Sequence, residues 1–359
     1  MAVGSVAVRG GPARSERSDD AVQTALLDGV SRTFALTIPQ LPADLRPVIA
    51  NAYLLCRIVD TIEDEPALSA PEKRRFAERF VAVVTGAAHA EPFAQELAPR
   101  LSASTIPAEH QLIRATPAVI RITRALPVPA REAMERCVRV MADGMISFQE
   151  HAGTAGLADL AALDRYCYVV AGVVGEMLTT LFCQHSPAIA RRGAALHALA
   201  RSFGEGLQLT NILKDLWDDR QRGACWLPRD ICAAAGVDLG ALVPGGAGQG
   251  DFAAALGRLI GIAHAHLRNA LAYVLLVPRR ERGIRTFCLW AIGLAMLTLR
   301  NLNRRRDFAD GAEVKVSRRG VRATIAVTAL AQSSDALLRF AFALLGWGLP
   351  RAAQQVTGV

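Results

Sequence analysis

Two groups of acidic residues, far apart in the chain, repeat one spacing. In each group three carboxylates stand at positions i, i+3 and i+4. The first group is Asp60, Glu63 and Asp64, and the second is Asp215, Asp218 and Asp219. On a helix, residues at this spacing project from one face within about one turn. Their charges repel one another there, so the spacing indicates that a cation lies between them.

The residues around each group indicate a buried setting. Ala52 to Val59, directly before the first group, are almost all apolar, so their helix is expected to be buried with its acids facing an interior cavity. In the second group, Gln208 and Asn211 extend the acidic stripe. One such group fits a solvated acidic turn equally well, but two fit a symmetric clamp for a polyanion. Because Mg²⁺ prefers a few carboxylates together with water and phosphate, we predict that all six acids bind magnesium.

The elements that carry these groups are predicted to be helices. Apolar residues recur at i, i+3, i+4 and i+7 in long runs rich in Ala and Leu, and alternating runs typical of strands are nearly absent. We therefore predict an all-α protein with a single helical domain over residues 21–350, after a disordered tail over residues 1–20. Asp44 is expected to cap the first acidic helix, and residues 237–251 to form a glycine-rich loop. The predicted helices span residues 44–65, 71–85, 109–125, 128–151, 158–184, 189–221, 252–277, 281–303 and 321–346.

Composition limits the binding partners and the cellular compartment expected for the protein. The 359 residues carry a formal net charge of +8, which fits nucleic acid, an anionic membrane surface or a polyanionic small substrate. Seven scattered cysteines without a C-x-x-C pair predict reduced thiols, and neither a disulfide framework nor a zinc site. Residues 1–20 lack the apolar core of a secretory signal, so we expect a cytoplasmic protein. No run resembles a membrane span. Leu337 to Leu349, with the basic run 279–285, is expected to make at most a peripheral contact at the inner membrane surface.

The acidic motifs resemble those of the squalene and phytoene synthase family, whose hallmark is two Asp-x-x-Glu-Asp-like motifs facing each other across a central cavity. The resemblance covers residues 24–345. Within the family, the sequence from Leu54 to Asp64 and the basic stretch from Val314 to Gly320 resemble squalene synthases more than phytoene synthases. The matching segments, in the family's order, are Ser31–Phe34, Asp60–Asp64, Arg165–Gly175 and Gln208–Asp219.

The resemblance implies a fold and a reaction. The fold is an isoprenoid-synthase-type bundle of helices around a central cavity. The reaction is the head-to-head condensation of two farnesyl diphosphates through a cyclopropyl intermediate, presqualene diphosphate, followed by reduction with NADPH to squalene. Mg²⁺ and NADPH are the implied cofactors, and farnesyl diphosphate is the implied partner.

Roles for single residues follow from the resemblance and from side-chain chemistry. Tyr166 matches the family's tyrosine implicated in proton removal during cyclopropane formation. Ionisation of the diphosphate is assigned to Mg²⁺ on Asp60, Asp64, Asp215 and Asp219. The residues expected to bind the substrate diphosphates are Ser31, Arg32, Phe34, Arg57, Gln208, Asn211 and Lys214.

Two further sets complete the predicted site. Lys315, Arg318 and Arg319 are candidates for the NADPH phosphate, because the resemblance extends to this stretch. The aromatic rings expected to stabilise a carbocation belong to Phe34, Phe287 and Trp290.

Departures from the family pattern keep alternatives open. Ala291 to Gly293 stand where animal and fungal squalene synthases have Pro-Gln, Lys214 replaces the usual arginine, and Asp218 replaces a common glutamate. A non-reductive enzyme that makes dehydrosqualene, phytoene or presqualene diphosphate is therefore the second candidate. The net positive charge is the one feature that favours a basic helical nucleic-acid-binding protein. Because acidic stripes without a metal ion repel phosphate, we expect no nucleic-acid partner. An inactive helical scaffold leaves the intact acidic groups unexplained.

Overall fold

Runs of Ala and Leu at helical spacing fold as helices throughout residues 14–149, 153–244 and 251–352, the parts of the chain that the computed structural model describes. Within those ranges the only strand-like feature is an isolated parallel bridge between Leu157 and Pro228. The predicted all-α fold is confirmed.

The chain begins with two helices that lead to the first acidic segment, and the helices up to residue 167 are α1 (Arg14–Val30), α2 (Arg32–Thr37), α3 (Arg46–Asp64), α4 (Ala70–Val84), α5 (Ala90–Leu97), α6 (Pro107–Arg114), α7 (Thr116–Ala125), α8 (Val128–Gln149) and α9 (Leu160–Cys167). Short 3-10 turns follow α2 and α5, at η1 (Ile38–Gln40) and η2 (Ala98–Arg100).

A π-helical turn, η3 (Tyr168–Gly172), joins α9 to the rest of the chain. The remaining helices are α10 (Val173–His185), α11 (Pro187–Ala190), α12 (Gly193–Lys214), α13 (Leu216–Gln221), α14 (Arg229–Ala233), α15 (Phe252–Leu276), α16 (Arg282–Arg304), α17 (Gly311–Val314), α18 (Arg318–Ala331) and α19 (Asp335–Leu345).

Several boundaries differ from those predicted. Helix α1 begins at Arg14, so residues 14–20 are helical and not part of a tail; residues 1–13 lie outside the described part of the chain. Pro117 starts a new helix at α7 because its ring fixes a first-turn conformation. Ser334 caps α19 and so divides the predicted last helix in two. Asp44 does not cap α3: Leu45 is the N-cap, and the Asp44 carboxylate lies 3.0 Å from Nδ1 of His185.

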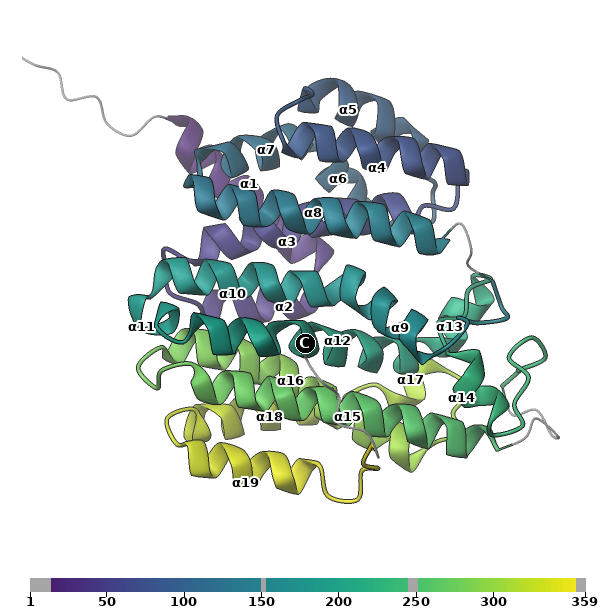
Figure 1. Ribbon diagram of the computed structural model, residues 1–359. Coiled ribbons are helices and arrows are strands. Elements are labelled where there is room, and N and C mark those ends of the chain that lie inside the picture. Colours follow the sequence, from purple (N-terminus) through teal and green to yellow (C-terminus); the bar gives the residue numbers. More distant parts are fainter. Residues whose placement is uncertain (1–13, 150–152, 245–250, 353–359) are drawn as a thin grey trace, which may run out of the picture.

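The helices stack in layers, with α12 in the middle of the molecule and α15 packed along it (Figure 1). Close approach of α12 to its neighbours depends on glycine. A Cβ at Gly204 would lie 2.0 Å from the carbonyl oxygen of Ala171, and one at Gly206 would lie 2.8 Å from Cβ of His266. The helices of Tyr166 and of the second acidic group are therefore held backbone to backbone, as only small residues allow.

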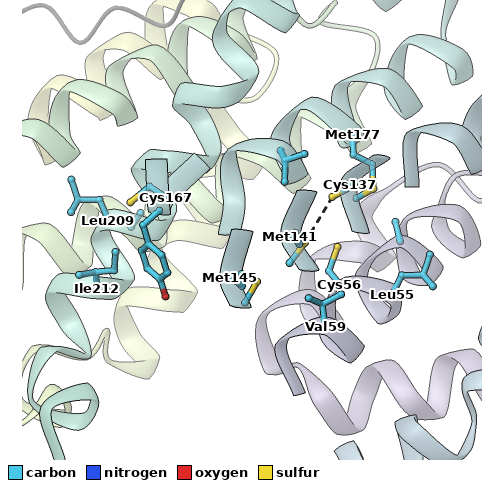
Figure 2. Packing of buried hydrophobic residues seen from close by; sticks show 14 of the residues in the cluster. Leu55, Cys56, Val59, Cys137, Met141, Met145, Cys167, Met177, Leu209 and Ile212 are labelled. Atoms are coloured by element: carbon cyan, nitrogen blue, oxygen red, sulfur yellow. Dashed lines mark hydrogen bonds between the residues drawn. The ribbon is translucent and has the colours of Figure 1, made fainter. Parts of the chain in front are cut away.

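Sulfur and aliphatic side chains fill the space between α3 and α8. Figure 2 shows Cys56 of α3 beside Cys137 and Met141 of α8, and the Cys137 thiol donates to the Met141 sulfur over 3.9 Å. All seven cysteines are free and six of them are buried, as the sequence predicts. This packing fixes the helix that ends in the first acidic group.

Three segments are long and apolar enough to cross a membrane, by length and composition alone: Leu160–His185, Phe252–Leu276 and Arg282–Arg304. The prediction that no such segment exists is therefore wrong. In the structure the most apolar windows of the second and third are 72% and 67% buried. Their hydropathy is accounted for by burial at the centre of the bundle, where a helix is apolar on all sides.

Candidate active site

The first acidic group lies at the end of α3, where Asp60 keeps 28% of its side chain exposed. Burial raises the pKa of Asp60 to about 7, and the charges of Asp64 and Glu109 add to that rise. Arg57 opposes it: its guanidinium lies 3.6 Å from Asp60 and also pairs with Glu109 of α6. The buried Nε of Arg57 has no hydrogen-bond partner among the described residues. This donor lies one turn from the acids, where a phosphate oxygen is expected.

Glu63 is the buried member of the first group, with 5% of its surface exposed. Gln149, at the end of α8, donates a hydrogen bond to its carboxylate. Burial and the charge of Asp64 raise the pKa of Glu63 to about 8. Asp64 itself is exposed. The group thus combines a buried carboxyl with a raised pKa at Glu63 and an exposed side chain at Asp64.

The second acidic group spans a break in the helix. Asp215 ends α12 and begins α13, and its carbonyl accepts a hydrogen bond of 2.9 Å from the amide of Asp219. Lys214 lies 3.1 Å from the Asp215 carboxylate. Burial raises the pKa of Asp219 to about 7, and the charges of Asp215, Asp64 and Asp218 contribute, whereas Arg222 opposes them. The predicted spacing is kept, but on a short separate helix.

The two acidic groups are close enough to affect each other's titration. The charge of Asp64, on α3, contributes to the raised pKa of Asp219, on α13. Burial raises the pKa of Tyr166, on α9, well above the ordinary value, and the charges of Glu63, Asp219 and Asp64 contribute to the rise. Tyr166 therefore lies near residues of both groups.

Aromatic rings hold Tyr166 in position. Its ring lies against Trp226, with centroids 4.1 Å apart and planes 9° apart, and the edge of Phe148 approaches at 5.2 Å. The ring is 5% exposed. Two faces of the ring are therefore occupied, which restricts the direction of the hydroxyl.

The predicted magnesium ligands do not form a closed shell. Among the described residues, the only three possible ligands whose atoms all lie within 4.8 Å of one another are Asp164, Glu205 and His266. The six predicted acids lie at the end of α3, at the junction of α12 and α13, and on α13. Burial is the main cause of the raised pKa of Asp60 and of Asp219, and neighbouring carboxylates contribute to it. Such a donor set fits Mg²⁺ ions that take their other ligands from water and substrate phosphate.

The Asp164 cluster already contains a cation. Arg201 donates to both Asp164 and Glu205, and its guanidinium lies 4.9 Å from the ring centre of Tyr168. The His266 ring is hydrogen-bonded at Nδ1 to the hydroxyl of Ser202 at 2.8 Å. Arg201 thus offsets part of the negative charge of the cluster, which we interpret as a charge network that joins α9, α12 and α15.

The predicted diphosphate-binding residues have mixed settings. Ser31 caps α2, and its hydroxyl accepts from the amide of Phe34 at 2.9 Å. Phe34 stacks at 4.7 Å from Tyr53. Gln208 is half-buried on α12 and Asn211 is exposed there. The Arg32 side chain lies outside the described part of the chain.

The start of α17, which precedes the basic stretch, adjoins the second acidic group. A Cβ at Gly311 would lie 3.0 Å from the carbonyl oxygen of Lys214 and 3.5 Å from a carboxylate oxygen of Asp218, so this turn rests on the acidic segment. Lys315, Arg318 and Arg319 follow and are all exposed. The basic residues therefore follow, within the chain, a short helix that lies against the second acidic segment.

Two of the three predicted carbocation-stabilising rings are close together. Phe287 lies 6.2 Å from Phe34 and 6.2 Å from Phe182. Trp290 is buried on the same helix, and its Nε1 has no partner among the described residues. Arg285, in the basic run expected to face lipid, is fully buried, so residues 279–285 do not form one lipid-facing surface.

Four contact residues of the site were not predicted: Glu109, Gln149, Trp226 and Arg201. Glu109, Gln149 and Trp226 are remote in sequence from the residues that they contact, and Arg201 is remote from Asp164 although it stands four residues before Glu205. Trp226 precedes a Leu-Pro pair, which signals only a chain reversal, and Gln149 ends a long amphipathic helix like any polar residue. No spacing rule links such residues to their partners, so only the packed structure identifies them.

Comparison with known proteins gives a family match and several relatives. The squalene/phytoene synthase family model matches residues 27–320. The squalene synthase of Schizosaccharomyces pombe is 28% identical over 291 residues, covering 79% of this chain and 59% of that protein. That of Gibberella zeae is 30% identical over 210 residues, covering 57% and 42%. The phytoene synthase of Thermus thermophilus is 38% identical over 120 residues, covering 33% and 38%. The chain spans about half the length of the curated squalene synthases that it matches.

Solved structures resemble the fold. A ligand complex of the squalene synthase TcSQS superposes with a TM-score of 0.71 at 22% identity, covering 91% of each chain. A dehydrosqualene synthase complex gives 0.62 at 19% identity, covering 89% of this chain and 98% of the other. At this level of identity the likeness extends to the all-helical fold.

Proposed function

This chain belongs to the squalene/phytoene synthase family, and from that premise we propose that it is a prenyltransferase that condenses two farnesyl diphosphates head to head into presqualene diphosphate and reduces this with NADPH to squalene. The observation that carries the proposal is a buried tyrosine, Tyr166, near enough to both acidic groups for the charges of Glu63, Asp64 and Asp219 to act on it. Two polyanion-binding acidic groups near a buried tyrosine are what ionisation of a diphosphate followed by proton removal requires.

In this proposal, residues of both acidic groups and their polar neighbours bind and orient the diphosphates. Asp60, Asp64, Asp215 and Asp219 are the proposed Mg²⁺ ligands, with Glu63 and Asp218 beside them. Bound Mg²⁺ supplies the positive charge that neutralises a leaving diphosphate. Arg57, Lys214 and Asn211 then present N–H donors to the phosphate oxygens. Pairing with Glu109 holds the Arg57 guanidinium in place before substrate arrives.

Cyclopropane closure requires loss of a proton from the allylic carbon chain. We assign its capture to the Tyr166 hydroxyl, which passes its own proton to the released diphosphate. Burial and neighbouring carboxylates raise the pKa of Tyr166, so the group acts as a relay and not as a phenolate. Stacking on Trp226 holds the oxygen still, while the apolar residues of α9 and α12 keep water from the cation.

Reduction requires a bound dinucleotide. Lys315, Arg318 and Arg319 are the proposed contacts for its phosphate, because they are exposed beside α17, which rests on the second acidic segment. NADPH supplies a hydride that quenches the final carbocation. We also propose a cytoplasmic location with peripheral contact to the inner membrane surface, since both farnesyl diphosphate and squalene are amphiphilic or apolar.

The test is incubation of the purified chain with farnesyl diphosphate and Mg²⁺, with and without NADPH, followed by hydrocarbon analysis. Squalene that appears only with NADPH, with presqualene diphosphate accumulating without it, supports the proposal. A polyene or an alcohol under both conditions contradicts the reductive step.

The second candidate is a non-reductive family member. It is supported by the 38% identity with the Thermus thermophilus phytoene synthase and by Ala291 to Gly293, which depart from the pattern of animal and fungal squalene synthases. Geranylgeranyl diphosphate supplied in place of farnesyl diphosphate separates the two. Faster consumption of the longer substrate, giving a forty-carbon polyene without NADPH, identifies this candidate.

A further inference from the structure

Helix α19 presents an apolar stripe to solvent. Leu337, Phe340, Leu344 and Trp347 follow one another at intervals of three or four residues, and their exposed fractions are 51%, 68%, 58% and 84%. Leu338, on the opposite side, is buried. Because helical residues three and four apart share one side, Leu337, Phe340 and Leu344 form an outward stripe, and the exposed Trp347 follows two residues after the end of α19. Figure 1 places α19 at the outer edge of the bundle, remote from α4 and α5.

Polar contacts hold α19 in this orientation. At its start the Asp335 carboxylate lies 2.7 Å from the fully buried Arg285 and 2.8 Å from Arg279. At its end Arg300 donates to the carbonyl of Leu344 at 3.0 Å. Asn303 donates to the carbonyl of Gly348 at 3.1 Å. The apolar stripe therefore belongs to a fixed helix, and is not a loose segment that has failed to pack.

Neighbouring helix α18 extends the patch. Val327 and Leu330 are 46% and 80% exposed, and α18 packs directly against α19. Of the ten large apolar side chains that are strongly exposed in the described residues, six lie between positions 327 and 347. An apolar surface concentrated in this way marks a place where the protein meets another phase or molecule. We call these six residues the α18–α19 face.

The charged residues around the α18–α19 face indicate the chemistry of its binding partner. The segment from Lys315 to Arg351 holds six basic residues and one acid, Asp335, which is already paired within the fold. Arg339 and Arg351, together with Arg268 of α15, line a groove of about 850 Å³ between α15 and α19. The groove has an apolar floor formed by Leu271, Leu275, Phe342 and Leu349. Guanidinium groups above an apolar floor match a phosphate headgroup above an acyl chain.

We propose that the α18–α19 face docks on an anionic phospholipid bilayer, with Phe340 and Trp347 entering the boundary between headgroups and acyl chains and the groove arginines binding lipid phosphate. Tryptophan is suited to this boundary because its ring is apolar and its N–H is polar. A second copy of the chain is a poorer occupant, because it would bring an equally basic segment against the first. The inference specifies the membrane contact included above and does not depend on the catalytic proposal.

Binding of the full chain to vesicles tests the proposal without substrate. We expect co-flotation with vesicles of phosphatidylglycerol and phosphatidylcholine, much weaker binding to pure phosphatidylcholine, and release by salt. The other three tryptophans, Trp217, Trp226 and Trp290, are at most 7% exposed, so a blue shift of fluorescence on binding reports Trp347. Quenching by brominated acyl chains locates the same ring in the membrane.

Variants on the exposed face give the sharper result. The double change Phe340→Ser and Trp347→Ser is expected to weaken vesicle binding at least ~10-fold, since each ring loses its contact with the acyl region. Arg339→Gln and Arg351→Gln are each expected to weaken it about fivefold, and only on anionic vesicles. Ile106→Ser and Val128→Ser change exposed apolar residues elsewhere, with exposed fractions of 45% and 52%, and are the controls.

Three results overturn the proposal: no binding to either vesicle, binding unchanged in the Phe340/Trp347 variant, or a dimer in solution that this variant dissociates while vesicles are not bound. All of these substitutions lie at the surface, so thermal melting is expected to match the parent and loss of binding is not explained by unfolding. Activity in detergent is recorded alongside. Vesicle binding with no activity contradicts the proposed function alone, and activity with no vesicle binding contradicts this inference alone.

Discussion

The carboxylates of Asp64 and Asp219 lie on different helices, yet the charge of the first raises the pKa of the second. Asp64 ends α3 and Asp219 lies on α13, and the charges of both also raise the pKa of Tyr166, on α9. This coupling has consequences for both catalysis and stability, because an ion that binds between the groups relieves a repulsion that the fold has built in.

Removing one carboxylate charge from either acidic group is expected to lower activity strongly and to raise stability. Asp60→Asn and Asp219→Asn should each slow diphosphate release at least about 100-fold, because a ligand of the leaving-group cation is lost. Without Mg²⁺ at pH 8, each should stabilise the fold by about 1 kcal/mol, since a carboxylate with a raised pKa is removed. Release is measured with a coupled diphosphate assay and stability by urea unfolding. Asp44→Asn, whose side chain is 75% exposed, is the control.

The pH dependence of stability follows from the same groups. Burial raises the pKa of Asp60 and Asp219 to about 7 and that of Glu63 to about 8, whereas unfolding returns them to ordinary values near 4. From about pH 6.5 the folded chain still holds part of the protons that the unfolded chain has already lost, so stability falls as the pH rises, by about 1 kcal/mol for each group up to pH 8.5, and it levels off once the folded carboxyls are ionised. The pKa of His266 is lowered to about 4, so its ring is neutral in both states across most of this window.

Magnesium is expected to reverse that trend. Because the ion binds deprotonated carboxylates, the stabilisation it gives should grow as the pH rises. Thermal melting of the chain over the same pH range, with and without Mg²⁺, measures both slopes. Equal slopes in the two series would show that the ion does not bind these carboxyls.

Tyr166→Phe is expected to separate the chemical step from folding. The ring still stacks on Trp226, so melting should stay close to that of the parent, while formation of presqualene diphosphate falls about 100-fold with an unchanged KM. Single-turnover product analysis measures the step. Tyr273→Phe is the matched control: its hydroxyl is hydrogen-bonded to Thr179 at 2.9 Å, and its loss should cost about 1 kcal/mol of stability but no activity.

Removing the basic edge is expected to affect reduction alone. The triple change of Lys315, Arg318 and Arg319 to glutamine should raise the KM for NADPH at least about tenfold, because charge-assisted contacts with its phosphate are lost. The rate of presqualene diphosphate formation should not change. Arg304→Gln, at another exposed basic position, is the control. A proportional loss of both half-reactions would place these residues at the first substrate instead.

Breaking the buried ion pair behind α19 is expected to destabilise the fold. Asp335→Ala leaves the Arg285 guanidinium fully buried, with only the carbonyl groups of Val274 and Val277 as partners. An uncompensated buried charge costs about 3 kcal/mol or more. Urea unfolding measures the loss. Asp238→Asn, in a surface loop, should leave stability within about 0.5 kcal/mol of the parent.

The sequence alone was enough to identify the acidic groups and the helices that carry them. Spacing of i, i+3 and i+4 is a local property of one helix, and apolar periodicity is local as well. For that reason the positions of both acidic groups and of most helices follow from residue spacing. Local signals failed at helix ends, as at Asp44 and Asp215, where packing and not the capping residue decided the boundary.

Tertiary structure decided how the groups relate to one another. That Glu63 is the buried member, that Gln149 holds it and that Trp226 lies against Tyr166 depend on helices brought together from distant parts of the chain. Such contacts follow from packing shape, which no spacing in the sequence encodes. The apolar character of α19 was visible in the sequence, but only the buried Arg285 and its partner Asp335 determine that its stripe faces outward.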